Sequence, residues 1–89
     1  MTVRVLLKAG SQMSYHCHEH RNEVWTIVAG TGKVILDGNE RIITAGDVVS
    51  ILNGQKHTIV AETETILIEV QMGKEISVHD KIKYSISDN

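Results

Sequence analysis

Apolar and polar residues alternate along this chain with a period of two, which is typical of β-strands rather than helices. Val3, Val5 and Leu7 alternate with polar positions, and later short segments are rich in β-branched and aliphatic side chains. These segments are residues 24–28, 33–36, 41–44, 48–52, 58–60 and 65–70. No stretch keeps the apolar i, i+3, i+4, i+7 spacing of an amphipathic helix. The pattern therefore predicts an all-β protein.

Turn sequences separate most of the predicted strands, and Asp37-Gly38 is the clearest of them. A type I′ hairpin turn needs positive φ at both central residues, and Asp-Gly tolerates this. At the usual 8–12 residues per strand and turn, the chain accommodates about eight strands, as in a small antiparallel β-barrel or jelly roll. We predict a single domain over residues 1–89, in which residues 80–89 form an edge strand or a loose tail.

Composition excludes some classes of partner. The chain has 9 Lys and Arg against 11 Asp and Glu, and the cations are not clustered, so we expect no nucleic-acid partner. No apolar run approaches the ~18 residues of a membrane span, so we expect no membrane partner either. The single Cys17 fits a reducing compartment, and we expect a cytoplasmic protein. Because so short a chain leaves strand edges and apolar surface uncovered, we also predict a homodimer.

Five of the 89 residues are histidines, and three of these lie within five positions. If residues 13–18 form a strand, His16 and His18 project from the same face and can share one metal ion. Glu23 opens the next apolar run, and His57 opens a later strand. Three imidazoles and one carboxylate suit one divalent ion, which would be Zn, Mn, Co, Ni or Fe.

The neighbours of these residues receive different interpretations. Cys17 alternates away from the histidine face, which indicates a packed thiol rather than a ligand. His79 is expected to be a solvated surface residue. His20 and Glu19 fall in a predicted turn at the mouth of the barrel, and they are candidate bases for proton transfer, since histidine titrates near neutral pH.

The spacing of these residues resembles the motifs of the cupin superfamily. The first motif, G-x₅-H-x-H-x₄-E-x₆-G, is matched at every position by Gly10, His16, His18, Glu23 and Gly30. The second motif, G-x₅-P-x-G-x₂-H-x₃-N, is matched by Gly46, Gly54 and His57, while Leu52 and Ala61 replace its Pro and Asn. The resemblance implies that the three histidines and Glu23 bind a metal inside a small β-barrel.

A narrower resemblance is to the cupin domain of type II mannose-6-phosphate isomerases, over roughly residues 3–84. It is carried by His18, His20-Arg21, Glu23, Trp25, the turn at residues 30–34 and the E-V-Q-M-G stretch at residues 69–73. The family usually has Gln where His16 stands and His where Val24 stands, and its acidic segment appears here as Val78-His79-Asp80. The resemblance implies a metal-dependent sugar-phosphate aldose–ketose isomerase.

Two further residues take candidate roles with a sugar-phosphate substrate. Arg21 is the candidate phosphate anchor, because a planar guanidinium suits phosphate and the matching arginine is regarded as important for isomerase activity in the family. Trp25 lies two residues after Glu23 and shares its inward face, either as part of the core or as a platform for the sugar ring. Both interpretations of Trp25 stay open.

Two alternatives to an isomerase also stay open. One is a non-catalytic cupin that binds a small carbohydrate or anion, which the altered acidic segment and the absence of an obvious base favour. The other is an Fe(II)-dependent cupin dioxygenase, because the same ligand set activates oxygen with iron. The fold alone does not choose among them.

Overall fold

The computed structural model describes residues 1–73 and 79–84, which form nine strands and no helix. The strands are β1 (Thr2–Leu7), β2 (Tyr15–Cys17), β3 (Asn22–Ala29), β4 (Thr31–Leu36), β5 (Asn39–Thr44), β6 (Val48–Ile51), β7 (His57–Ala61), β8 (Thr65–Met72) and β9 (Ile82–Tyr84). All strand pairs are antiparallel. The predicted all-β antiparallel class is thus confirmed.

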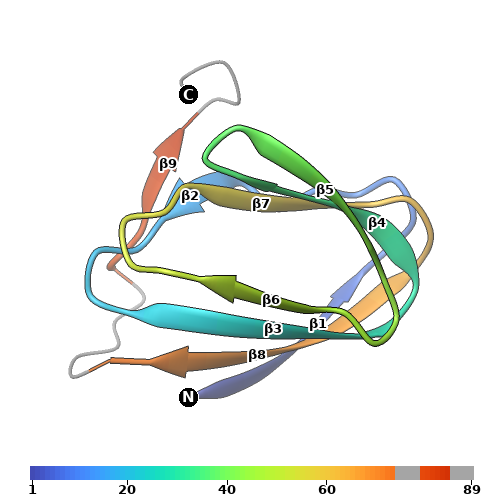
Figure 1. The fold of residues 1–89 in the computed structure, drawn as a ribbon, viewed down its shortest axis with the longest axis horizontal. Coiled ribbons are helices and arrows are strands. Elements are labelled where there is room, and N and C mark those ends of the chain that lie inside the picture. Colours follow the sequence, from blue (N-terminus) through green and yellow to red (C-terminus); the bar gives the residue numbers. More distant parts are fainter. Residues whose placement is uncertain (74–78, 85–89) are drawn as a thin grey trace.

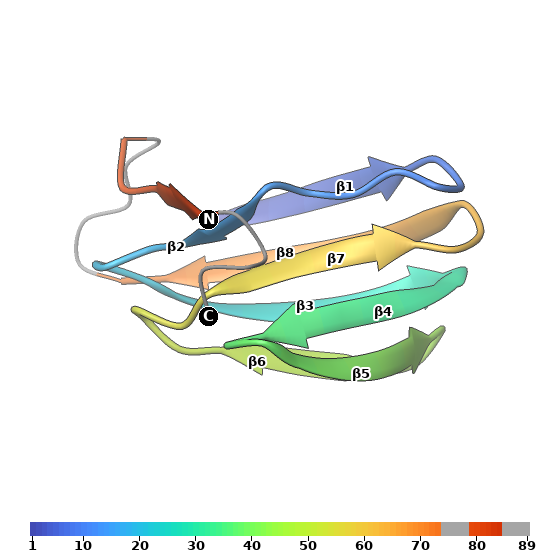
Figure 2. The same cartoon turned by 90° about the horizontal axis from the view of Figure 1, so that it is seen from above.

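The strands form two sheets that face each other as two layers (Figure 1). One sheet has the order β1-β8-β3-β6, and the other has the order β5-β4-β7-β2-β9. Of the neighbours in these two orders, only β4 and β5 follow each other in sequence. Figure 2 shows the layers from above, with β2 and β9 toward the end at which β3 begins and β8 ends. Residues far apart in the chain therefore meet at that end.

Two turns require residues that tolerate a positive φ or a close approach of the backbone. Asp37 has a φ of 47° and Gly38 a φ of 83°, and Leu36 pairs with Asn39 across the turn. This is the predicted two-residue hairpin with positive φ at both central positions. Gly30 has a φ of 94°, and a Cβ there would lie 2.2 Å from the backbone oxygen of Glu64. A side chain at residue 30 would therefore separate the β3–β4 turn from the start of β8.

The core fills the space between the sheets, and Trp25 extends it to the histidine end, where its ring packs edge-on against His57. The core consists of fully buried apolar side chains from six strands: Trp25, Ile27, Val34, Ile43, Val49, Ile51, Ile59 and Leu67. Burying one aliphatic side chain of this size contributes about 1.5–3 kcal/mol. The core thereby holds the two sheets together and fixes the strands that carry the polar residues at the other end.

The C-terminal segment and β2 differ in detail from the sequence prediction. Residues 82–84 form the edge strand β9, which pairs with β2 through Tyr15↔Tyr84 and Cys17↔Ile82. Residues 85–89 lie outside the described part of the chain. Strand β2 is shorter than the predicted 13–18, and His18 lies just beyond it, where its carbonyl oxygen accepts a 2.6 Å hydrogen bond from Gly54.

Candidate metal centre

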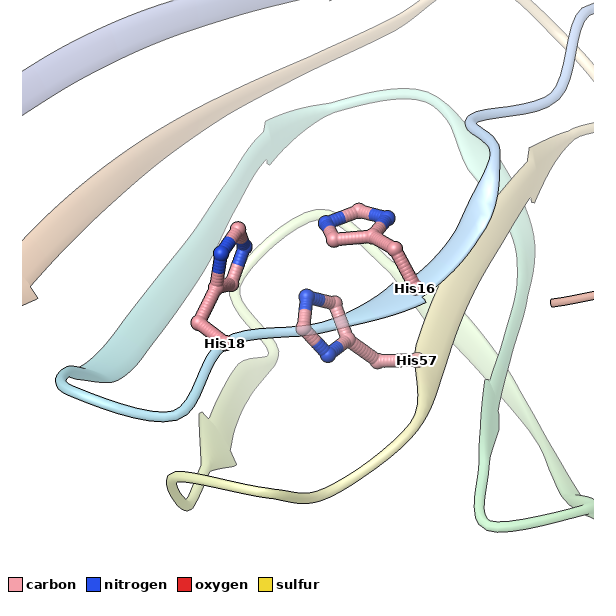
Figure 3. Close-up of side chains that lie close together, drawn as sticks. All are labelled: His16, His18 and His57. Atoms are coloured by element: carbon pink, nitrogen blue, oxygen red, sulfur yellow. The ribbon is translucent and has the colours of Figure 1, made fainter. Parts of the chain in front are cut away.

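Three histidine side chains converge between the two sheets (Figure 3). His16 lies on β2 directly opposite His57, the first residue of β7, and His18 follows β2. One ring nitrogen from each of the three lies within 4.8 Å of the others. All three side chains are buried, with between 1% and 6% of their surface exposed. Antiparallel pairing of β2 with β7 thus brings together residues that are 39 to 41 positions apart in the sequence.

Backbone carbonyl groups fix the orientation of each ring. His16 Nδ1 donates to the carbonyl of Ser14 at 2.6 Å, His57 Nδ1 donates to that of Gln55 at 2.8 Å, and His18 Nδ1 donates to that of Asp80. A carbonyl oxygen only accepts, so Nδ1 carries the proton in each neutral ring. Nε2 is then the ring nitrogen that carries the lone pair, and ligating histidines usually coordinate a metal through the nitrogen opposite such a hydrogen bond.

Burial keeps at least two of these rings neutral. Desolvation lowers the pKa of His16 to about 3, although the hydrogen bond to Ser14 acts in the opposite direction. Desolvation also lowers the pKa of His57, against the opposing effects of the carbonyl of Gln55 and the charge of Glu23. Metal ions bind the deprotonated imidazole nitrogen, so both rings are in the state that a metal needs at neutral pH.

Glu23 lies beside the cluster on the inward face of β3. Its Oε2 is 3.3 Å from His18 Nε2, and its Oε1 is 3.9 Å from His57 Nε2. The carboxylate is 2% exposed, and its Oε1 accepts a 2.9 Å hydrogen bond from Trp25 Nε1. The four residues predicted as metal ligands are therefore close together at one end of the barrel.

The donor set fits a divalent metal ion. His57 Nε2 is buried and has no hydrogen-bond partner among the described residues, which is costly for a polar atom unless something binds there. Three imidazoles and one carboxylate are a borderline set of the kind that binds Zn, Mn, Co, Ni or Fe. This unpartnered nitrogen favours a metal site over a merely packed histidine cluster.

Arg21 contacts two members of the same group. Its Nε donates to Glu23 Oε2 at 2.8 Å, and its Nη2 donates to His18 Nε2 at 2.9 Å. Its side chain is 9% exposed, so the guanidinium pairs with a buried carboxylate rather than standing in solvent. The predicted phosphate anchor thus lies at the histidine cluster, and it compensates the charge of Glu23.

Two cavities meet at Arg21. The first has a volume of about 390 Å³, within the range of small-molecule sites, and is lined by His16, His18, Arg21, Glu23, Glu69, Gln71 and Lys81 together with Met1, Met13 and Ser14. The second, of about 460 Å³, is lined by Glu19, His20, Arg21, Asn22, Asn53, Met72 and Gly73. The candidate bases His20 and Glu19 are exposed and line the second cavity rather than the one that His16 and His18 line.

Trp25 is located in the core. It is fully buried, it does not line either of these cavities, and its indole nitrogen donates to Glu23. Two predictions about neighbouring residues are confirmed: Cys17 is a packed thiol, 3.6 Å from the hydroxyl of Tyr84, and His79 is exposed. Trp25 therefore acts on the first cavity indirectly, through its hydrogen bond to Glu23, which lines that cavity.

Sequence reasoning did not identify Asp80, which holds the turn after β2. Its Oδ1 and Oδ2 accept 2.9 Å hydrogen bonds from the backbone N–H groups of Glu19 and His20, and these bonds lower the pKa of its carboxyl group. Its carbonyl oxygen is the partner of His18 Nδ1. Asp80 is 62 residues from His18, so no local pattern could have indicated the contact.

Sequence reasoning also assigned no role to Glu69 and Gln71, which are buried on the inward face of β8 and line the first cavity. Burial raises the pKa of Glu69, and the charge of Glu23 acts in the same direction. Here a signal was present: both residues continue the every-second-position pattern that Thr65 and Leu67 begin.

Comparison with known proteins gives a family and several relatives. Residues 3–71 match the family described as Cupin domain. The chain is 36% identical over 84 residues to a mannose-1-phosphate guanylyltransferase of Salmonella montevideo and 31% identical over 84 residues to one of Escherichia coli (strain K12). Each match covers 92% of this chain but 18% of the relative, so the chain spans less than a fifth of these proteins.

Solved structures share the architecture. A predicted oxalate decarboxylase from Thermotoga maritima has a TM-score of 0.79 at 29% identity, covering 82% of this chain and 65% of that one. KdgF from Halomonas sp. has a TM-score of 0.79 at 26% identity, covering 84% and 69%. Salicylate 1,2-dioxygenase from Pseudoaminobacter salicylatoxidans, at 20% identity and a TM-score of 0.73 over 76% of this chain and 18% of that one, shares the fold. No helix that could cross a membrane is present among residues 1–73 and 79–84.

Proposed function

The chain belongs to the cupin domain family, and we propose that it is a metal-dependent sugar-phosphate aldose–ketose isomerase of the mannose-6-phosphate isomerase type. The observation that carries the proposal is the unpartnered His57 Nε2, buried within a cluster of three oriented histidines of which His16 and His18 line one cavity with Glu23 and Arg21. The curated relatives are named for a reaction of mannose 1-phosphate, which supports a mannose phosphate as the ligand.

In this proposal His16, His18, Glu23 and His57 hold one divalent ion. A bound ion would supply Lewis-acid polarisation of the oxygen atoms at C1 and C2 of the sugar. The chain's own contribution is to hold the ligands still: backbone carbonyl groups orient the three rings, and Trp25 Nε1 orients the carboxylate of Glu23. Such supporting hydrogen bonds commonly change metal affinity or activity by about 10–100-fold.

Isomerisation requires no oxidant or reductant. A base takes the proton from C2 of the aldose and returns it to C1, while the proton of the C2 hydroxyl moves to the carbonyl oxygen at C1. The cavity offers two cationic side chains for the phosphate group, Arg21 and Lys81, and the planar fork of Arg21 suits a phosphate. We assign Arg21 as the anchor.

His20 and Glu19, the candidate bases, line the neighbouring cavity, which shares Arg21 with the histidine cavity. They would reach a substrate only if it extended across Arg21. This observation favours a second candidate function, a non-catalytic cupin module that binds a carbohydrate or an anion without converting it.

A dioxygenase is the third candidate. It requires Fe(II) in the same ligand set, and the structural similarity to salicylate 1,2-dioxygenase concerns the fold. Oxygen uptake by iron-loaded protein would favour it over the isomerase.

We further propose that the protein is a homodimer formed through the outer face of the β1-β8-β3-β6 sheet. Leu6, Val28, Val48 and Val70 lie on this face and are between 38% and 53% exposed. Arg4 is the only charged residue among the outward positions of these four strands. An apolar face with so little charge can pack against a second copy of itself about a two-fold axis. Sedimentation of the wild type and of Val28→Lys would test this, with a monomeric wild type as the contrary outcome.

The central experiment combines metal analysis with an assay. Protein purified without added metal should contain about one divalent ion per chain, and His57→Ala should abolish this while the exposed His79→Ala retains it. Interconversion of mannose 6-phosphate and fructose 6-phosphate should then require the metal. Unchanged metal content in His57→Ala would contradict the metal centre. Absence of turnover with Mn, Co, Zn, Ni or Fe would contradict the isomerase and leave the binding module.

A further inference from the structure

We propose that Glu69 and Gln71 form a hydroxyl-binding wall of the histidine cavity, which accepts hydrogen bonds from neighbouring hydroxyl groups of a polyol ligand. The inference rests on the proposed function, since it assigns one side of the same cavity to the sugar part of a sugar phosphate. Neither residue belongs to the predicted ligands, bases or anchor.

The position of the two residues follows from the register of β8. Gln71 lies opposite Glu23 on β3, and Glu69 lies opposite Trp25. Both side chains share the inward face of β8 with Leu67, and they are 8% (Glu69) and 6% (Gln71) exposed. Since both line the cavity that His16 also lines, they form a polar wall beside the candidate metal centre.

The hydrogen bond between the two residues determines how the amide group of Gln71 is oriented. Gln71 Nε2 donates to Glu69 Oε2. Because a carboxylate only accepts, the amide nitrogen must face Glu69, and the amide oxygen must point away from it. Gln71 Oε1 is buried and has no hydrogen-bond partner among the described residues. A buried acceptor without a partner costs about 1–3 kcal/mol, so a donor from a ligand would recover that free energy.

Glu69 is also short of partners. No cation of the described residues lies within ion-pair distance of its carboxylate, and the amide of Gln71 is its hydrogen-bond donor. Burial accordingly raises the pKa of Glu69. The wall therefore offers carboxylate and amide oxygens as acceptors, and one N–H of Gln71 is already engaged by Glu69.

Hydroxyl groups are the donors that complement such a wall. A cationic ligand would also satisfy Glu69, but Lys81 lines the same cavity and would repel it, and the charge of Glu23 is already compensated by Arg21. Lys81 and the guanidinium N–H groups of Arg21 favour an anionic end. The cavity thus combines a cationic side with an acceptor side, which matches a molecule that carries a phosphate and adjacent hydroxyl groups.

The test compares two anions on zinc-loaded protein by isothermal titration and ¹H–¹⁵N NMR. Sorbitol 6-phosphate carries hydroxyl groups, and ethyl phosphate carries none. Gln71→Leu and Glu69→Met should each weaken sorbitol 6-phosphate binding by about tenfold or more, as expected for a lost buried hydrogen bond, and leave ethyl phosphate within about twofold. Ile42→Val, at an exposed position of β5 outside the cavity, should change neither.

Three outcomes would overturn the inference. They are equal binding of sorbitol 6-phosphate by the wild type and both inward variants, equal losses for the two anions, and no preference of the wild type for sorbitol 6-phosphate over ethyl phosphate. Should an inward variant fail to fold, the side-chain amide signals of Gln71 in the wild type decide, because sorbitol 6-phosphate should shift them and ethyl phosphate should not. A retained preference for sorbitol 6-phosphate without isomerase turnover would reject the proposed function alone.

Discussion

The two ends of the barrel interior differ in chemistry although the same strands build both. On β8, Leu67 is fully buried among apolar side chains, and two and four residues later Glu69 and Gln71 are buried as polar groups. On β3, Ile27 belongs to the apolar end and Glu23 to the polar end. The side chains of each strand therefore share one inward face. Along that face they change from apolar to polar over four residues, which is about 13 Å at 3.3 Å per residue.

This difference separates stability from function. The apolar end is saturated with packing contacts, whereas the polar end keeps atoms without partners, His57 Nε2 and Gln71 Oε1. Buried polar atoms without partners lower the stability of a domain and persist where a ligand uses them. Burial of the apolar side chains thus contributes the free energy of folding that offsets the cost of the unpartnered polar atoms at the other end.

The largest expected effect comes from truncating the apolar end. Leu67→Ala should lower the free energy of unfolding by about 2–5 kcal/mol, because it leaves a cavity among fully buried side chains. Urea unfolding followed by circular dichroism measures this. Ile42→Ala is the control, since Ile42 is 82% exposed and a change there should stay within about 0.5 kcal/mol. Equal effects of the two substitutions would contradict the assignment of the core.

The second largest expected effect is the contribution of a bound metal ion to the free energy of unfolding. Zinc at about 100 times its Kd should stabilise the wild type by about 2.7 kcal/mol, and EDTA should reverse this. His57→Ala should melt at the same temperature with zinc and with EDTA, because it lacks the buried ring whose Nε2 is unpartnered. Differential scanning calorimetry gives the comparison. A zinc-dependent Tm in His57→Ala, matching that of His79→Ala, would place the ion elsewhere.

A smaller effect is expected where the two ends meet. Trp25→Phe keeps an aromatic ring in the core but removes the hydrogen bond to Glu23, at a cost of about 1.5–3 kcal/mol for a bond to a charged group. It should also weaken zinc binding by about 10–100-fold, because Glu23 loses its orienting donor. Competition with a chelating dye measures the zinc affinity. Destabilisation with unchanged affinity would show that Trp25 only packs.

The smallest effect has the opposite sign and depends on pH. The pKa of Glu69 is raised in the folded state, so ionisation of this residue lowers the stability of the metal-free protein as pH rises above the unfolded value of 4.5. Glu69→Gln should therefore raise the Tm at pH 7.5, and the difference should shrink toward pH 4, where both states of the wild type are protonated. A Tm gain that is the same at both pH values would contradict an ionisation effect.

Local patterns predicted most of the strands and the candidate ligands. Every predicted segment coincides at least in part with an observed strand, and the Asp37-Gly38 hairpin is confirmed, because alternation and turn chemistry are properties of a few adjacent residues. The every-second-position spacing of His16 and His18 similarly placed them on one side. The contacts of Asp80 were beyond such reasoning, since they join residues about 60 positions apart.

The sequence by itself determined the all-β class, the family and the residue types available for a metal site, because these depend on periodicity and on fixed spacings. Only the tertiary structure decided that Trp25 is fully buried, that His20 and Glu19 line a different cavity from His16, and that Gln71 presents an unpartnered oxygen. The physical reason is that exposure and hydrogen bonding at this site depend on the pairing of β2 with β7 and of β3 with β8, which no local pattern specifies.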